Sequence, residues 1–498
     1  MLWKTTRRII PVFIIGFWAV MMVLLLLREG YFSKNTYTFA QQRWDTPIDW
    51  QMGIFTADDK RIGFIQIRTQ PELVSPYGPA FKLDLFTKLE TVVFSTPVSL
   101  IVQGFAWFSE RKGLENFNIA LRSGDTRFSI SGEYDGKVIS GNIVTGKEVV
   151  PYNIPVGRDV LLAGGPGLPL LDTPILPPGE SISINVFDPL TMSTQKAVIT
   201  SHSKEVLQID GEDLEVYKMS VTISGLTTTV WVTSNQEIVQ AELPIGIKLR
   251  KISLAEALAS KEEEKGTTGD IITSTAIKPK GKIPFRGAKQ MWIKIKNLSE
   301  YALPPVGLYQ TKTSEGYFIS PPTTVKSVPL TERVLRNVPQ QSLASSPLIP
   351  ADHPKIKQLA EEIVGNETDT WEKSKKIFEW IYKNIKKQPS FNIPSALSVL
   401  ETRSGDCNEH AVLFTALARA VGIPTQICIG LVWSEELKAF GYHAWVEVFC
   451  GDWIPMDPTL GQEIADATHI KLIEGNIEEW TRIALYINQI EIEVVNVE

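Results

Sequence analysis

The hydrophobic pattern of this chain changes its period near residue 350, and that change limits the folds that the chain can adopt. From about Trp44 to Leu249, apolar and polar residues alternate in short runs, such as Phe117, Ile119 and Leu121. A period of two buries one face of a β-strand and leaves the other in solvent. Later apolar residues fall at three- and four-residue spacings, which are typical of helices. We therefore predict a multidomain α+β protein whose first part is a sheet.

Turn signals divide the alternating region into hairpins. Asp135-Gly136 and Asp210-Gly211 lie between alternating runs, where a tight turn needs residues that accept a positive φ. We expect residues 40–265 to form a large antiparallel β domain, either a half-barrel or a sandwich.

A smaller β-rich stretch follows, including the alternating segment Trp292 to Ile295. Residues 266–332 are predicted as an accessory domain. Residues 333–350 contain several prolines and are predicted as a linker. The remaining residues, 351–498, form the predicted carboxy-terminal domain.

An apolar run near the amino terminus is long enough to cross a membrane as a helix. It extends from Ile9 to Leu27 without a charged residue. Lys4, Arg7 and Arg8 precede it, and this positive charge favours a cytoplasmic amino terminus. A cleaved signal peptide is the rival, but no small-residue cleavage site follows closely. Residues 1–30 are therefore predicted as a single-pass anchor, with the body of the protein outside the cytoplasm.

Charge and cysteine content argue against a nucleic-acid partner and a disulfide framework. The net charge of −6 supplies no basic field that would attract a polyanion, so nucleic acid is not a predicted partner. The three cysteines are too few for a disulfide framework in 498 residues. No cofactor is predicted.

Cys407 is the candidate nucleophile. It follows Ser404-Gly405-Asp406 and precedes a helical run that Gly422-Ile423-Pro424 ends. The positive end of a helix dipole and its free amides favour a thiolate over a thiol. We therefore expect the sulfur at this helix start to be ionised.

Two further residues complete a possible triad. His443 lies in a predicted strand, and Asp457 ends the next one. The chain between Cys407 and His443 forms one helix and a hairpin, which can bring the imidazole close to the sulfur. Asp457 can then accept a hydrogen bond from the imidazole nitrogen that does not face the sulfur, and so fix the tautomer of the ring.

Four ordered motifs resemble the core of the transglutaminase-like superfamily. They are RSGDCNEHA from Arg403 to Ala411, LARAVGIP from Leu417 to Pro424, YHAWVEV from Tyr442 to Val448, and WIPMDPT from Trp453 to Thr459. The resemblance implies a papain-like α+β core in residues 351–498. It makes Cys407 the nucleophile, His443 the general base and acid, and Asp457 the orienting carboxylate.

The implied reaction is attack of the cysteine on a carboxamide or peptide carbonyl of a protein or peptide substrate. An amine acceptor gives a transglutaminase, whereas water gives a deamidase or a protease, and the triad leaves this open. The backbone N–H of Cys407 could supply half of an oxyanion hole. Trp380, Tyr382 and Gln388 are candidates for the second donor, although each could instead be a packing or surface residue.

Other histidines near the motifs have alternative interpretations. His410 shares a helix face with Cys407 and could be a base, a supporting residue or a packed side chain. A zinc site on Cys407, His410 and His443 would need further ligands at close spacing, and the chain has only five histidines. We predict no metal site. His469 could lie near the site, but we expect it to be structural.

A non-enzymatic function is the alternative. A domain that kept this fold but lost the oxyanion donor could act as a scaffold. The amino-terminal β region, which faintly resembles half-barrel domains of the bacterial envelope, would then bind a lipid, a glycan or a protein.

Overall fold

The computed structural model describes residues 47–498 apart from 94–95, 110–112, 125, 158–159, 163–174, 190, 210, 236, 245, 259–274, 300–301 and 390–392. The predicted anchor from Ile9 to Leu27 lies outside the described residues. Among the residues that are described, no helix is long and apolar enough to cross a membrane.

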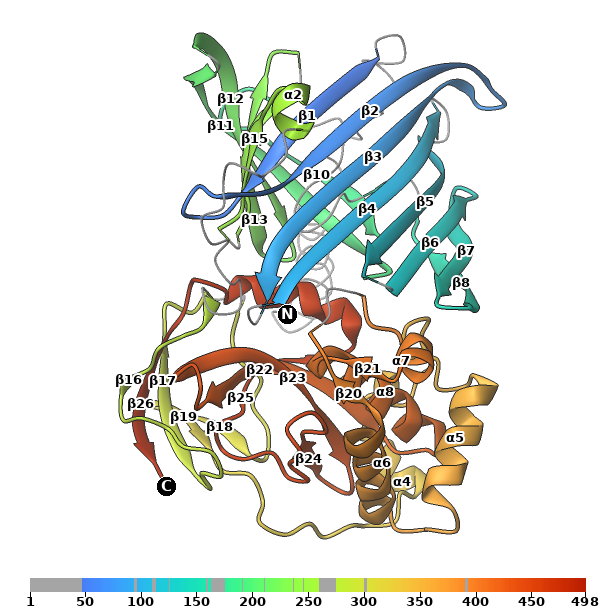
Figure 1. Cartoon of the computed structure of the whole chain (residues 1–498), viewed down its shortest axis with the longest axis vertical. Helices are drawn as coiled ribbons and strands as arrows, with labels where there is room; N and C mark the ends of the chain where they lie inside the picture. The colour runs from blue at the N-terminus through green and yellow to red at the C-terminus, as the bar shows by residue number, and fades with distance from the viewer. Residues whose placement is uncertain are drawn as a thin grey trace, which may run out of the picture. The chain divides into compact units, whose positions relative to one another are not determined.

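The alternating region forms one large sheet. In chain order its described strands are β1 (Ile48–Phe55), β2 (Arg61–Ser75), β3 (Gly78–Val93), β4 (Thr96–Ser109), β5 (Gly113–Ser123), β6 (Thr126–Tyr134), β7 (Val138–Thr145), β8 (Glu148–Pro155), β9 (Val160–Leu162), β10 (Ser181–Asp188), β11 (Ser193–Ile209), β12 (Glu212–Ile223), β13 (Leu226–Thr233), β14 (Ile238–Glu242) and β15 (Lys248–Lys251). They lie in the order β8 to β1, then β15 to β9 (Figure 1). All pairs are antiparallel except β9 with β10, so the predicted large antiparallel sheet is confirmed.

The two arms of this sheet share a core. Phe117 on β5 and Phe187 on β10 are buried, and their ring centroids are 6.0 Å apart. The alternation read from the sequence therefore describes inward-facing residues on both arms. The first and last strands of the region, β1 and β15, pair with each other where the arms join.

A second sheet combines distant parts of the chain. Its strand order is β16 (Lys280–Gly281), β26 (Glu491–Val497), β17 (Met291–Lys296), β19 (Gly316–Ile319) and β18 (Gln310–Thr313). Strand β17 confirms the predicted strand at Trp292 to Ile295. Because β26 ends the chain yet lies between β16 and β17, this sheet crosses the proposed division between 266–332 and 351–498.

The carboxy-terminal part holds most of the described helices. They are α5 (Pro354–Val364), α6 (Thr370–Asn384), α7 (Ala396–Thr402) and α8 (Cys407–Ala420), and two short turns precede them, α4 (Glu332–Leu335) and the 3₁₀ turn Gln340–Ser342. The described chain is thus mostly β with few helices.

A four-stranded sheet lies against α8. Its order is β24 (Trp453–Met456), β23 (Ala439–Phe449), β22 (Thr425–Ser434) and β25 (Ile470–Gly475). Helix α8 packs on β22 and β23 on one side and on α5, α6 and α7 on the other (Figure 1). Its residues from Glu409 to Arg419 are all buried. The rigid centre of this part is therefore the helix that begins at Cys407.

Candidate active site

Cys407 is the first residue of α8, and the chain fixes that start with a capping box. The Asp406 carboxylate accepts from the N–H of Asn408 at 2.8 Å, and the Glu409 carboxylate accepts from the N–H of Asp406 at 2.9 Å. Such a reciprocal pair satisfies backbone donors that a helix start leaves free. Cys407 keeps part of its surface in solvent, whereas Cys428 and Cys450 are buried.

The expected ionisation of Cys407 is not what its surroundings favour. Burial of the sulfur and the neighbouring Asp406 carboxylate raise the pKa of the thiol well above its ordinary range, and the N–H of Ala444 only partly offsets this. The prediction of an ionised sulfur took account of the helix dipole but not of the capping carboxylate. The resting group is therefore a neutral thiol that needs a base.

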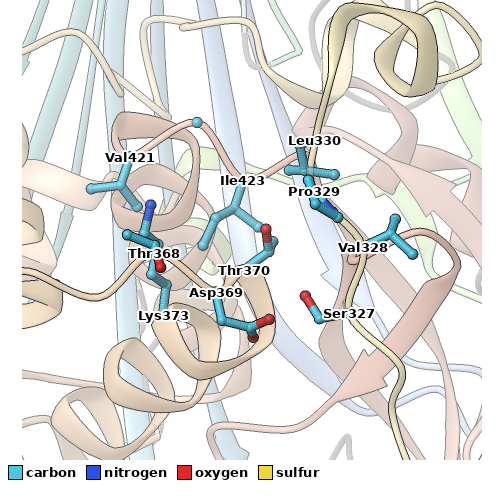
Figure 2. Close-up of a pocket in the computed structure, with 11 residues that line it drawn as sticks. Ser327, Val328, Pro329, Leu330, Thr368, Asp369, Thr370, Lys373, Val421 and Ile423 are labelled. Atoms are coloured by element: carbon cyan, nitrogen blue, oxygen red, sulfur yellow. The ribbon is translucent and has the colours of Figure 1, made fainter.

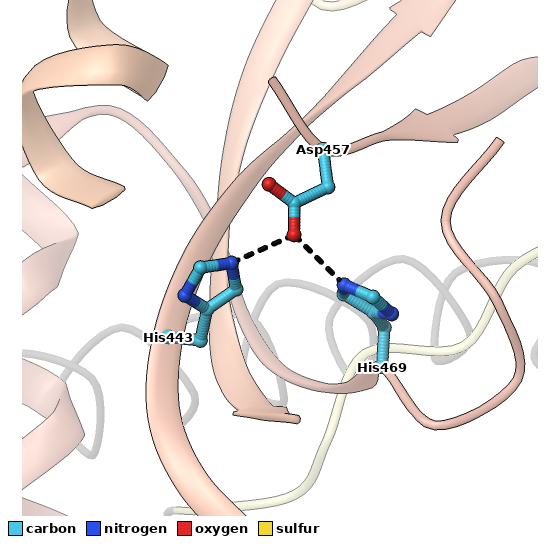
Figure 3. A group of neighbouring side chains, drawn as sticks. All are labelled: His443, Asp457 and His469. Carbon is cyan, nitrogen blue, oxygen red and sulfur yellow. Dashed lines mark hydrogen bonds and ion pairs between the residues drawn. The ribbon is translucent and has the colours of Figure 1, made fainter. Parts of the chain in front are cut away.

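His443 and Asp457 form a buried pair. The imidazole Nε2 lies 2.8 Å from Oδ2 of Asp457, and both residues are buried. In Figure 3 the other ring nitrogen of His443 points away from Asp457. Because Nε2 donates to a carboxylate, Nδ1 of the neutral ring is an acceptor for a proton.

Backbone donors hold Asp457 in place. Its Oδ1 accepts from the N–H groups of Thr459 at 2.8 Å and Leu460 at 2.9 Å. Burial opposes ionisation of Asp457, but the hydrogen bonds from His443 and His469 and the positive charge of His469 hold the pKa of the carboxyl well below its usual range. Asp457 is therefore an anion throughout the physiological pH range.

The sulfur lies beside the strand that carries His443. The backbone N–H of Ala444, the residue after His443 on β23, partly lowers the pKa of the Cys407 thiol. The packing of α8 against β23 accounts for this proximity. The fold thus brings Cys407 next to the residue that follows His443.

His469 belongs to the same cluster, although the sequence suggested only a structural role. Its Nε2 lies 3.1 Å from Oδ2 of Asp457, the oxygen that also accepts from His443 (Figure 3). Its Nδ1 lies 3.3 Å from Oδ1 of Asp466. No short motif links His469 to Asp457, since a loop and the start of β25 bring them together.

The predicted supporting residue His410 has a local partner. Its Nδ1 lies 2.6 Å from the carbonyl oxygen of Asp406 one turn back. Burial lowers the pKa of this imidazole, which keeps it neutral. His410 therefore braces the helix start rather than joining the His443–Asp457 pair.

The three predicted oxyanion candidates lie around the segment before Cys407. The Arg403 guanidinium covers the Trp380 ring at 4.7 Å, and the Lys387 ammonium covers the Tyr382 ring at 4.5 Å. These two aromatic rings are therefore occupied by cations.

The backbone of Gln388 is bonded to the loop that precedes Cys407. Its N–H donates to the carbonyl oxygen of Gly405 at 3.0 Å, where β20 (Lys386–Lys387) pairs with β21 (Ser404–Gly405). The exposed side chain of Gln388 thus extends from a backbone position that is hydrogen-bonded to Gly405, two residues before Cys407.

A metal is not needed to account for the buried cluster. Among the described residues, one ligand atom each from His443, Asp457 and His469 lie within 4.8 Å of one another. Direct hydrogen bonds join the same atoms, and the shared carboxylate oxygen accepts from both rings. The donor set is complete without an ion.

A cavity of about 460 Å³ lies at the other end of α8 (Figure 2). It is lined by Ser327 to Leu330, Thr368 to Thr370, Lys373 and Val421 to Ile423. A helix of 14 residues spans about 20 Å, so this cavity is distant from Cys407. Asp369 in its wall caps α6 through the N–H of Glu372 at 3.0 Å.

Residues 357–458 match the family model described as the transglutaminase-like superfamily. No curated protein matches the chain. The matched segment holds Cys407, His443 and Asp457 and ends one residue after the last of them.

Solved structures give only distant likenesses. A candidate cysteine protease from Cytophaga hutchinsonii has 18% identity, covers 45% of this chain and 83% of its own, and has a TM-score of 0.27. A β-barrel-like protein of a domain of unknown function from Brucella abortus has 7% identity, covers 42% and 96%, and has a TM-score of 0.30. A candidate protease from Parabacteroides distasonis has 10% identity, covers 74% and 65%, and has a TM-score of 0.19.

Proposed function

Because residues 357–458 form a transglutaminase-like domain, we propose that this chain is an enzyme that transfers or hydrolyses acyl groups of protein or peptide amides through Cys407, His443 and Asp457. The observation that carries the proposal is the buried His443–Asp457 hydrogen bond of 2.8 Å, made from β23, the strand against which the helix beginning at Cys407 packs. A nucleophile, a base and an orienting acid are the parts that acyl transfer requires.

The reaction begins with the thiol of Cys407. Nδ1 of His443 takes the thiol proton as the sulfur bonds to the amide carbon. The tetrahedral adduct then collapses, the carbon–nitrogen bond breaks, and the leaving ammonia or amine takes the proton from His443. A thioester on Cys407 remains.

The second half releases the acyl group. An amine or a water molecule attacks the thioester carbon and gives a proton to His443, which returns it to the departing sulfur. An amine forms a new amide bond, whereas water forms a carboxylate. The Asp457 anion stabilises the imidazolium in both halves.

The oxyanion of the adduct needs two donors. The backbone N–H of Cys407 at the helix start is one of them. Gln388 is the candidate for the other, since its backbone is already bonded to Gly405. Replacement of Gln388 by Ala should reduce kcat by about 10²-fold if its amide donates, while Gln388→Glu should not restore it.

We also propose that the residues before the described part anchor the protein in a membrane. The uncharged run from Ile9 to Leu27 and the preceding Lys4, Arg7 and Arg8 support a single pass with the body outside the cytoplasm. Protease added to intact cells should then digest the body, and digestion only after lysis would contradict this orientation.

The decisive experiment measures three activities of the purified full chain. These are incorporation of a fluorescent primary amine into dimethylcasein, ammonia release from the same protein, and cleavage of a peptide library. Replacement of Cys407 by Ala should reduce whichever activity is found by roughly a thousandfold or more.

Cys450→Ala is the matched control, because it removes a buried cysteine outside the cluster. It should keep the activity. If the wild type and Cys407→Ala formed equally small amounts of product, the enzyme proposal would fail. The alternative would then be the scaffold function, in which the β region binds a lipid, a glycan or a protein.

A further inference from the structure

His469 receives a carboxylate at each ring nitrogen. Nε2 lies 3.1 Å from Oδ2 of Asp457. Nδ1 lies 3.3 Å from Oδ1 of Asp466 and 3.2 Å from its carbonyl oxygen. An imidazole can donate from both nitrogens only when it is protonated. The geometry therefore identifies the ring as an imidazolium.

The groups around His469 are mostly acidic or aromatic among the residues that the structure describes. The ring has no exposed surface. The titratable and charged groups that face it are Asp457 from the loop after β24, Asp466 from its own loop, and His443 from β23, whose ring centroid is 6.0 Å away. Trp445 from β23 contacts it edge-on at 5.2 Å. Consistently, the two carboxylates outweigh burial and raise the pKa of His469 to about 9.

Asp466 is itself held from three directions. It accepts from the N–H of Gly287 at 2.8 Å, from the side-chain amide of Gln462 at 2.7 Å, and from the N–H of Thr468 at 2.9 Å. The far end of the cluster is thus anchored to the second sheet region and to the loop after β24. A rigid Asp466 fixes the plane of the His469 ring.

We propose that His469 is a positioning residue that, as a buried cation, aims Asp457 at His443 and limits how strongly Asp457 attracts a proton to His443. The inference rests on the proposed function, because it concerns the base of that reaction. A second cation on the same carboxylate oxygen weakens the attraction between Asp457 and a protonated His443.

The test follows alkylation of Cys407 by iodoacetamide in the full chain, mapped by peptide mass spectrometry between pH 5 and 9. His469→Gln keeps an N–H for Asp457 but removes the charge, so the midpoint of the rising limb should move upward by about one pH unit. The plateau at high pH should stay within about threefold of the wild type. His469→Leu also removes the donor, so its plateau should fall about tenfold as well.

Asp466→Asn is the second variant, because it leaves Asp457 and His469 in the chain. Loss of one carboxylate makes His469 lose its proton more easily, so the midpoint should again move upward. Circular dichroism confirms that each variant is folded. A midpoint unchanged in both His469→Gln and Asp466→Asn overturns the inference, since a merely structural residue would change amounts of folded protein and not the midpoint.

His443→Ala separates this failure from failure of the proposed function. If Cys407 in His443→Ala reacts with the same pH profile as in the wild type, His443 is not its base and the proposed function fails. If His443→Ala abolishes the rising limb but the His469 variants do not move it, only the role of His469 is wrong.

Discussion

At the scale of single residues, protonation of His469 couples the fold to pH. The raised pKa of about 9 lies above the value of about 6.5 expected for the unfolded chain. A group with a raised folded pKa stabilises the fold fully below the unfolded value, and this contribution disappears as the pH rises through the folded value.

This predicts a loss of stability in alkaline solution. Between about pH 6.5 and 9 the free energy of unfolding should fall by an amount on the order of 3 kcal/mol from this one group. Urea unfolding at pH 6, 7.5 and 9 measures it. His469→Gln should be less stable at pH 6 and should have a flatter dependence, and an unchanged dependence would mean that His469 does not carry the charge.

Some residues of the candidate site could be predicted from the sequence, and others could not. Cys407, His443 and Asp457 were chosen from motifs, and the structure bonds the last two directly; their catalytic roles stay a prediction. His469 was missed as a partner because its contact with Asp457 depends on a loop path that has no local signature. The ionisation state of the Cys407 thiol was also predicted wrongly. The Asp406 side chain that caps α8 is negatively charged, and this charge disfavours a thiolate beside it.

At the scale of elements, the Asp406 carboxylate at the start of α8 has two effects, one on the stability of the helix and one on the ionisation of Cys407. The carboxylate of Asp406 stabilises the helix by capping it. The same carboxylate raises the pKa of Cys407. Asp406 therefore stabilises the start of α8 and disfavours the ionised form of Cys407.

Two substitutions of Asp406 separate these effects. Asp406→Asn keeps a capping oxygen and removes the charge, so the pKa of Cys407 should fall and alkylation should begin at lower pH, with stability nearly unchanged. Asp406→Ala also lowers the pKa but removes the cap, at a cost of about 1 kcal/mol. Ultraviolet titration of the thiolate and thermal unfolding distinguish them, and equal thiol titration in all three proteins would contradict the role of the charge.

The local elements could be predicted because their signals are local. Asp369 and Glu372, three residues apart, are a capping signal that can be read locally, and the Asp369 carboxylate accepts from the N–H of Glu372 at the start of α6. Gly422, with a φ of 78°, marked the end of α8 because glycine tolerates that conformation. Pairing between distant strands has no such signal, so the position of β26 was not foreseen.

At the scale of the whole molecule, the last strand completes a sheet begun some two hundred residues earlier. Strand β26 pairs with both β16 and β17. The segment that holds Cys407, His443 and Asp457 therefore lies within a loop of chain that this pairing closes. Substitutions that disrupt β26 should then destabilise more than β26 itself.

A matched pair of substitutions on β26 tests this dependence. Ile492 is 1% exposed and Val495 is 42% exposed. Ile492→Ala should lower the free energy of unfolding by about 2–5 kcal/mol, whereas Val495→Ala should change it by less than about 0.5 kcal/mol. Chemical unfolding measures both. Similar small effects would show that β26 contributes little to the fold.

The pairing of β1 with β15 has a consequence for biosynthesis. A ribosome releases β1 long before β15, so the hairpins of each arm can form early while one edge of β1 waits for its neighbour. Hydrogen-bonding groups on an uncovered edge invite pairing with other chains. A nascent protein cut before Lys248 would therefore expose this edge permanently, and such fragments should aggregate where the finished chain does not.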